Sequence, residues 1–327
     1  MDSAAQILAQ LRDAAAVGLP LKVRGNGSKP WMHAASAAQA LPINSHSGVI
    51  SYEPTELVVT VRAGTPLQDL EMLLAERDQM LAMEAPNFNG NSTIGGAVAL
   101  GWSGSRSPFA GGVRDTVLGL RMVNGLGEDL SFGGQVMKNV AGFDVSRLMV
   151  GSCGQLGAIL ELSLRVLPRP QQELTLCWPQ PDLAATRTVV ADWRRLGYPV
   201  SAASYTDGVL HARFSGSTAM LAELRQALLQ KMGGEESDGA YWRNLQFLEL
   251  PLFHSGWGDD KLFDCNGDVC WTAHTRQRGN GPRVGLAEGP QTAVDGKALS
   301  TLQQRVAAAF DPAGLFGLAG AAAAETA

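Results

Sequence analysis

Apolar residues recur at helical spacing at the start of the chain, where Ile7, Leu8 and Leu11 predict an amphipathic helix near residues 3–17. Three segments rich in apolar and β-branched residues follow and predict strands at 21–24, 48–52 and 57–62. Thr65-Pro66 then caps and starts another helix. Its apolar face carries Leu67, Leu70, Leu73 and Leu74. The order helix–strand–strand–strand–helix predicts one small lobe.

The pattern changes between residues 117 and 166, where strands dominate. Segments 117–124 and 128–132 flank Gly125-Leu-Gly127 and predict a hairpin. Residues 159–166 alternate apolar and polar side chains until Pro168-Arg-Pro170 ends the strand. These segments predict a second, strand-rich lobe, and the prolines with the polar residues 171–173 predict a domain boundary.

Beyond this boundary the pattern predicts a small α+β domain. It consists of a helix around 183–196, strands near 201–205 and 210–214, and a helix at 218–231. Residues 233–290 have little periodicity and are expected to be irregular, whereas 296–310 predict a last helix before an alanine-rich tail. The expected units are therefore a first domain over 1–170, a cap domain over 171–295, and a C-terminal helix and tail over 296–327.

Composition narrows the class of protein. A chain of 327 residues with 45% hydrophobic residues, 17% charged residues and 38 glycines is expected to fold into two loop-rich domains. The net charge of −5 gives no reason to expect a nucleic-acid partner. The N-terminus does not resemble a signal peptide, no apolar stretch reaches roughly 18 residues, and four cysteines are too few for a disulfide framework. We expect a cytoplasmic protein, for which any membrane contact would be peripheral.

Two glycine-bearing segments are candidate phosphate-binding loops. Arg24-Gly-Asn-Gly-Ser-Lys29 follows a strand, and Thr93-Ile-Gly-Gly96 offers a second turn beside a threonine hydroxyl. Successive backbone N–H groups in such turns can surround phosphate oxygens, although a tight turn is the alternative for either loop alone. A Rossmann fingerprint is not expected, because its third glycine would fall on Pro30, and no P-loop motif is present.

The ordered glycine-rich segments between residues 86 and 170 carry a family resemblance. They include Asn91-Ser-Thr-Ile-Gly-Gly96, Gly101-Trp-Ser-Gly104, Lys138-Asn-Val-Ala-Gly-Phe-Asp144 and Leu148-Met-Val-Gly-Ser-Cys-Gly-Gln-Leu-Gly-Ala-Ile159. From about residue 20 to 170 the chain resembles the FAD-binding domain of the vanillyl-alcohol oxidase and p-cresol methylhydroxylase superfamily. Within it, the chain is most similar to the E-type FAD-binding subunits of glycolate oxidases.

The resemblance implies an α+β fold in which FAD lies between two α+β subdomains, with a smaller α+β cap domain over the flavin. Residue by residue, it implies these cofactor-binding positions: Arg24, Gly25, Asn26, Gly27, Ser28, Thr93, Ile94, Gly95, Gly96, Ser103, Gly104, Gly157 and Ile159. Covalent members often carry a histidine where this chain has Gly27 and Ser28, so the resemblance implies noncovalent FAD.

The resemblance also implies a function and partners. An E-type chain works in a glycolate oxidase complex with a D-type catalytic flavin subunit and an F-type iron–sulfur subunit. The complex oxidises glycolate to glyoxylate and passes electrons through flavin to the iron–sulfur partner. The His-x-Gly-Asp-Gly-Asn-x-His motif of the D-type chains is missing here, which favours an accessory or electron-relay flavin. The alternatives are a free-standing FAD-dependent dehydrogenase of a 2-hydroxy acid or alcohol, and a scaffold protein of such a complex without flavin.

Other reactive residues receive no catalytic or metal role. Cys265, Cys270 and His274 lack a fourth ligand at motif-like spacing, so no metal site is expected. Cys153 is interpreted as a small residue near the cofactor rather than a nucleophile. A hydroxy acid would need an arginine and a base. The candidates, for which structural or solvated roles are favoured, are Arg213, Arg243, Arg276, Tyr205, His211 and His254. The segment from Asp311 to Phe316 is followed by Gly-Leu-Ala-Gly320, without the asparagine and basic residue usual at this point of the family.

Overall fold

A five-stranded antiparallel sheet organises the first domain of the computed structural model, which describes residues 2–29, 38–134, 144–206, 208–247, 261–264, 269–272, 283–286 and 296–316. In spatial order its strands are β3 (Val49–Glu53), β4 (Val58–Arg62), β8 (Ala158–Arg165), β6 (Val117–Val123) and β7 (Asp129–Gly133). In β8 the apolar residues Leu160, Leu162 and Leu164 are fully buried and alternate with half-buried ones. The alternation predicted at 159–166 therefore marks a strand with one face in the core.

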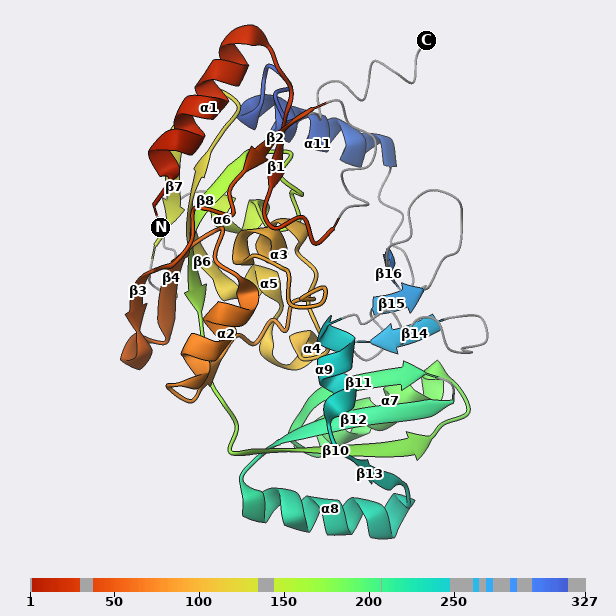
Figure 1. Ribbon diagram of the computed structural model, residues 1–327. Coiled ribbons are helices and arrows are strands. Elements are labelled where there is room, and N and C mark those ends of the chain that lie inside the picture. Colours follow the sequence, from red (N-terminus) through yellow and green to blue (C-terminus); the bar gives the residue numbers. More distant parts are fainter. Residues whose placement is uncertain are drawn as a thin grey trace.

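Three helices of this domain bury their apolar faces in the same core. Helix α1 (Ala4–Val17) buries Ile7 and Leu11 and ends at Gly18. Helix α2 (Leu67–Ala75) buries three of its four predicted leucines; the fourth, Leu73, is half-buried. Helix α3 (Ile94–Leu100) lies against β8 (Figure 1). The sequence predicted only a loop where α3 begins.

The remaining elements of this domain are short. Strands β1 (Leu21–Arg24) and β2 (Gln39–Pro42) form a parallel pair, and β5 (Gln79–Met80) pairs with β9 (Leu167–Pro168). The single-turn elements are η2 (Pro54–Glu56), α4 (Ser107–Ala110), α5 (Val113–Thr116) and α6 (Val145–Leu148). The parallel β1–β2 pair matters most for function, because the first glycine loop leaves the end of β1.

The predicted division into two lobes along the chain is wrong in one respect. Strands β3 and β4, expected in the first lobe, join the sheet of the second, because β4 pairs with β8 over Val58↔Arg165 to Arg62↔Glu161. The hairpin of β6 and β7 formed as predicted, with Met122 opposite Leu130. Strand pairing across about a hundred residues leaves no local pattern, whereas a hairpin does.

The cap domain is built on a seven-stranded sheet in the order β13-β10-β12-β11-β14-β15-β16. Its strands are β10 (Gln172–Pro179), β11 (Val200–Thr206), β12 (Val209–Gly216), β13 (Glu235–Ser237), β14 (Lys261–Asp264), β15 (Val269–Thr272) and β16 (Arg283–Leu286). Helices α7 (Leu183–Arg195) and α8 (Thr218–Met232) pack on this sheet around Trp178, Trp193 and Phe214 (Figure 1). The predicted helices and strands of residues 183–231 are all present.

Residues 233–290 contain regular structure that the sequence did not predict. Strands β13 to β16 extend the cap sheet, and helix α9 (Ala240–Phe247) connects the cap to the first domain. Trp242 Nε1 donates a hydrogen bond to Thr175 Oγ1 in β10 at 3.0 Å, while the carbonyl of Gln246 accepts from the backbone N–H of Asn87 at 2.8 Å. A helix of eight residues buries only Trp242 and Leu245, and this is too short a pattern to recognise.

The last helix, α11 (Gly296–Phe310), has the predicted bounds and returns to the first domain. Ala307, Leu315 and Phe316 belong to its hydrophobic core, and the Leu315 carbonyl accepts a hydrogen bond from the N–H of Leu21 at 2.7 Å. Asp311 is buried and accepts from the N–H groups of Leu315 and Phe316. The Asp-Pro-Ala-Gly-Leu-Phe segment therefore closes a turn against β1, while the residues after 316 lie outside the described part.

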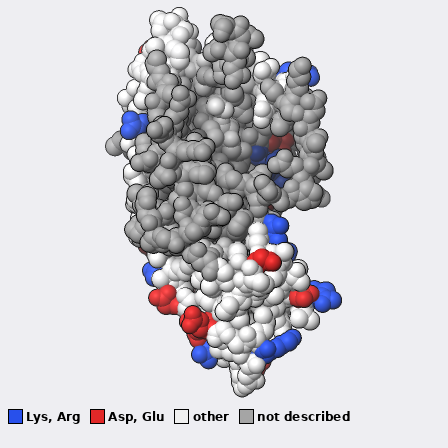
Figure 2. Space-filling view, turned by 90° about the vertical axis from the view of Figure 1, so that its right-hand side faces the viewer, with Lys and Arg blue, Asp and Glu red and all other residues white. Residues whose placement is uncertain are grey.

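The described surface carries charges of both signs. On the face shown in Figure 2, positive and negative side chains are interspersed over the cap domain. Within the described ranges, no helix combines the length and apolar composition needed to cross a bilayer. The same residues contain no cluster of three metal-ligating side chains. The side chains of Cys265, Cys270 and His274, and residues His33, His254 and Arg276, lie outside the described part.

Candidate functional site

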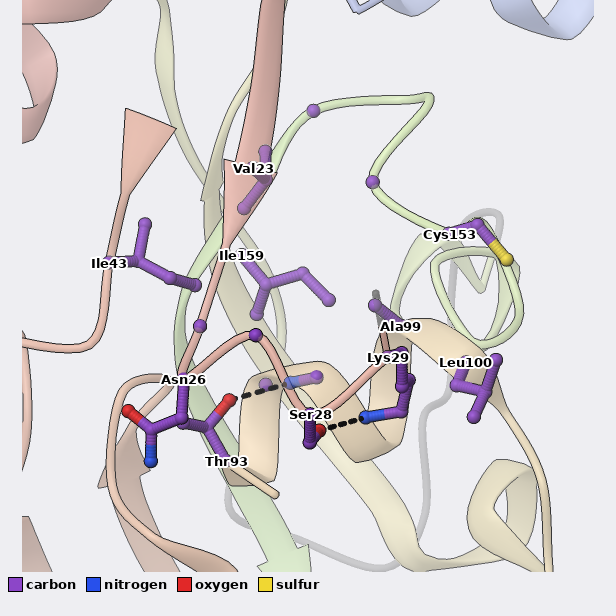
Figure 3. Close-up of a pocket in the computed structure, with 16 residues that line it drawn as sticks. Val23, Asn26, Ser28, Lys29, Ile43, Thr93, Ala99, Leu100, Cys153 and Ile159 are labelled. Carbon is purple, nitrogen blue, oxygen red and sulfur yellow. Dashed lines mark hydrogen bonds between the residues drawn. The ribbon is translucent and has the colours of Figure 1, made fainter. Parts of the chain in front are cut away.

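A groove lies where the glycine-bearing segments of the first domain meet (Figure 3). Its lining comes from β1 and the loop after it, the end of β2, helix α3, and the turn that leads into β8. The lining residues are Val23, Gly25, Asn26, Gly27, Ser28, Lys29, Ile43, Thr93, Gly95, Gly96, Ala99, Leu100, Cys153, Gly154, Gly157 and Ile159. Segments far apart in the sequence therefore converge on one site.

The first glycine loop supplies backbone donors to this groove. Gly27 has a φ of 73°, which a glycine adopts without strain. At Gly25 an added Cβ would lie 2.5 Å from Thr93 Oγ1, so the loop approaches α3 more closely than a side chain permits. The N–H groups of residues 25–28 make no hydrogen bond with any other described residue. Within the described part of the chain, these donors have no partner and could serve a ligand.

The second predicted phosphate loop, Thr93 to Gly96, does not supply free N–H donors as predicted. Thr93 caps α3, and its Oγ1 accepts from the N–H of Gly96 at 3.2 Å. The N–H of Ile94 donates to the Thr65 carbonyl at 2.9 Å, and the N–H of Gly95 donates to the Ala63 carbonyl at 2.8 Å. These donors are satisfied inside the domain. The segment therefore shapes the groove wall more than it supplies open N–H groups.

Nine of the thirteen residues carried over from the family resemblance line the groove. They are Gly25, Asn26, Gly27, Ser28, Thr93, Gly95, Gly96, Gly157 and Ile159. The other four are not in its lining. Arg24 is not in the lining, but its guanidinium packs against the loop, since a Cβ added at Gly27 would lie 2.9 Å from Arg24 Nη2. Ile94 is fully buried, Ser103 Oγ accepts from the Val113 N–H at 2.9 Å, and the Gly104 N–H donates to the Met83 carbonyl at 2.8 Å.

Lys29 ends the predicted loop Arg24–Lys29, but the sequence reasoning gave its side chain no role in binding. Its side chain is buried, and its Nζ donates to Ser28 Oγ at 3.1 Å (Figure 3). Burial lowers the pKa of Lys29 to about 8, and the nearby thiol of Cys153 opposes this shift. A lysine directly after a glycine loop was the available signal.

Cys153 lines the groove, in line with its interpretation as a small residue at this site. Burial raises the pKa of its thiol, although Lys29 acts in the opposite direction. The thiol is therefore protonated at neutral pH and poorly suited to nucleophilic attack. Val23, Ile43, Ala99 and Ile159 add apolar surface. Open N–H groups, one ammonium and apolar walls together fit a dinucleotide such as FAD.

The candidate substrate residues of the cap are engaged elsewhere. Arg213 lies 2.7 Å from Glu84 and also faces Glu173, so its charge is compensated. His211 stacks on Tyr241 with ring centroids 4.1 Å apart, and its Nδ1 lies 3.1 Å from Cys177 Sγ. Burial lowers the pKa of His211 to about 4, so the ring is neutral at pH 7. Neither residue lines the groove, and the exposed Arg243 lies beside a separate polar cleft.

Comparison with known proteins identifies the family of this chain. The family model of the FAD binding domain matches residues 1–133. Glycolate oxidase subunit GlcE of Escherichia coli (strain K12) is 41% identical over 252 residues, which cover 77% of this chain and 71% of GlcE. Glycolate oxidase subunit GlcD of Bacillus subtilis (strain 168) is 31% identical over 144 residues, covering 44% of this chain and 30% of GlcD.

More distant similarity extends to other flavoproteins. D-2-hydroxyglutarate dehydrogenase of Xanthomonas citri pv. viticola is 28% identical over 192 residues, which are 58% of this chain but only 40% of that enzyme. The solved structure of alkyldihydroxyacetonephosphate synthase superposes with a TM-score of 0.61 at 18% identity, over 77% of this chain and 55% of that one. The chain thus spans only part of these longer enzymes and shares their fold. From its identity to GlcE over more than two thirds of both chains, we conclude that this chain belongs to the family of glycolate oxidase subunit GlcE, FAD-dependent oxidoreductases with the vanillyl-alcohol oxidase and p-cresol methylhydroxylase type of fold.

Proposed function

We propose that this chain is the FAD-binding subunit of a glycolate oxidase complex that oxidises glycolate to glyoxylate. The observation that carries the proposal is the 41% identity to a glycolate oxidase subunit over 77% of the chain. Its partners would be a D-type catalytic flavin subunit and an F-type iron–sulfur subunit, and the complex would work in the cytoplasm or at the inner face of the membrane. Bound FAD would accept a hydride or electrons and pass electrons on singly.

The nine groove residues are the proposed contacts of this FAD, and they would hold it without a covalent bond. The first loop has a serine and a glycine where a histidine would be needed for a flavin link. The thiol of Cys153 is protonated because burial raises its pKa. Ile94, Ser103 and Gly104 would act behind the lining, by fixing the loops through the contacts described above, and Arg24 would support the first loop by packing against Gly27.

We further propose an accessory or electron-relay role for this flavin rather than direct oxidation of glycolate. A 2-hydroxy acid needs a cation for its carboxylate and a base for its hydroxyl proton. Among the described residues that line the groove, Lys29 is the one charged side chain, and none is an arginine or histidine. The buried arginines at the domain interface already pair with glutamates.

The test is the visible absorption spectrum of the purified full chain, before and after anaerobic addition of glycolate, alone and with its partner subunits. We expect acid precipitation to release the flavin from the protein. We also expect glycolate to leave the flavin of the isolated chain oxidised and to bleach the flavin bands of the assembled complex. Bleaching of the isolated chain by glycolate would instead indicate a free-standing dehydrogenase. A chain that stays colourless after reconstitution with FAD would indicate a scaffold protein.

A further inference from the structure

Lys29 carries a buried positive charge that no described carboxylate neutralises. The residue is 8% exposed, and its ammonium has one hydrogen-bond partner, the uncharged hydroxyl of Ser28. It also lies 4.8 Å from the centroid of the Phe88 ring. Among the described residues, the group that acts on its charge is the Cys153 thiol, which is itself protonated at neutral pH.

The buried arginines of the described chain, unlike Lys29, are paired with carboxylates. The side chains of Arg106 and Arg213 are 6% and 5% exposed, and each faces both Glu84 and Glu173. Removing a charge from water without a counter-ion is costly, and a lysine stem ending in a methyl group would occupy the same space without this cost. An ammonium kept unpaired in a groove is therefore placed to meet an anion from outside the chain.

The neighbouring backbone suits the same kind of ligand. The N–H groups of residues 25–28 precede Lys29 directly and have no hydrogen-bond partner among the described residues, whereas those of Ile94, Gly95 and Gly96 are used inside the domain. A diphosphate needs several converging donors and a compensating positive charge. Residues 25–28 supply donors, and Lys29 is the charged residue of the described lining that can supply the charge.

We propose that the ammonium of Lys29 makes an ionic contact with the diphosphate of FAD, together with the backbone N–H groups of residues 25–28. The inference rests on the proposed placement of FAD in this groove. It makes Lys29 a binding residue that fixes the cofactor by charge, while the groove walls hold the flavin and adenine by apolar contact.

The experiment compares FAD and riboflavin binding by the full-length chain stripped of flavin, measured by quenching of flavin fluorescence at low and high salt. The variants are Lys29→Met and Lys29→Arg. Lys22→Met is the matched control, because Lys22 lies in β1 outside the groove lining. We expect Lys29→Met to raise the Kd for FAD about ten- to a hundredfold, as loss of a charged contact does. Lys29→Arg should lose less affinity for FAD than Lys29→Met, and Lys22→Met should bind FAD as tightly as the unsubstituted chain.

Two further readouts separate an ionic contact from a structural role. Riboflavin, which lacks phosphate, should bind Lys29→Met and the unsubstituted chain equally, and FAD binding to Lys29→Met should depend less on salt. The flavin-free Lys29→Met variant should melt at or above the temperature of the unsubstituted chain, because an uncompensated buried charge has been removed.

An unchanged Kd for FAD in Lys29→Met, or an equal loss for riboflavin and FAD, would overturn the inference while leaving the proposed function intact. An unsubstituted chain that binds no FAD would overturn both. If Lys29→Met does not fold, the decision rests on the unsubstituted chain: salt that weakens FAD binding but not riboflavin binding supports the contact, and equal salt effects overturn it.

Discussion

The close approach of Gly25 to Thr93 permits a quantitative test of the groove. A Cβ at position 25 would lie 2.5 Å from Thr93 Oγ1 and 3.2 Å from its Cγ2. Thr93 is 2% exposed and its Oγ1 caps α3, so the side chain has little freedom to move away. Overpacking of this kind costs about 1–3 kcal/mol, so Gly25→Ala should lower the free energy of unfolding of the first domain by that amount.

The companion substitution Thr93→Ala should cost about 1 kcal/mol, the usual loss for a helix cap. It also removes both atoms that a residue-25 Cβ would strike; the remaining Thr93 Cβ is at an ordinary 3.4 Å. The double variant should therefore be about as stable as Thr93→Ala alone, which gives a coupling of about 1–3 kcal/mol between the sites. Thr93→Ser is the control, because it keeps Oγ1 and so should not rescue Gly25→Ala.

The measurement is chemical denaturation of the flavin-free chains, followed by tryptophan fluorescence, together with the Kd for FAD of each. We expect FAD affinity to fall in Gly25→Ala and to recover in part in the double variant. Additive losses of stability, or a rescue by Thr93→Ser as large as that by Thr93→Ala, would refute the close contact of the two segments.

Three further predictions concern charged residues. Glu84→Gln should destabilise the chain by about 3–5 kcal/mol, because it leaves the buried Arg106 and Arg213 short of a counter-charge; thermal denaturation checks this, and a shift in melting temperature below about 1–2 °C would contradict it. Asp311→Ala should cost about 2–4 kcal/mol by orphaning two buried N–H groups, and an unchanged melting temperature would exclude the turn described. Burial holds the pKa of Lys29 at about 8 against 10.5 unfolded, so the unfolded chain binds more protons between these values. The stability of the flavin-free chain should therefore rise from pH 8 to 10.5 by about 3 kcal/mol more than that of Lys29→Met; parallel pH profiles would refute this.

The sequence predicted those elements whose residues repeat at regular spacing over several turns or strands. Helices α1 and α11 and the β6–β7 hairpin agree with their predicted ranges, because amphipathic spacing and a glycine turn are local signals. The pairing of β4 with β8 and the helix α9 were not predicted. The first depends on residues about a hundred positions apart, and the second buries too few side chains to leave a periodic pattern.

The functional site shows a similar limit. A family motif identifies which backbone segments form the groove, but it does not give the direction of each side chain. Arg24 belongs to the motif but packs against Gly27 without lining the groove, whereas Val23 and Lys29, on either side of the motif's core, line it.

The distribution of positive charge determines what this chain can recognise by itself. A small hydroxy acid offers one carboxylate, which is best bound by a guanidinium with free donors. The buried guanidiniums of Arg106 and Arg213 pair with Glu84 and Glu173 across the two domains. Burial alone would raise the pKa of the Glu173 carboxyl, but the two arginines outweigh this effect and hold the pKa below its usual range. Freeing either arginine for a substrate would leave Glu84 and Glu173 with one buried counter-charge between them. The charge of Lys29, in contrast, is uncompensated among the described residues and lies beside open backbone donors. Such a pattern favours binding of a dinucleotide over recognition of a small acid, so we expect the residues that recognise glycolate to come from a partner protein of the complex.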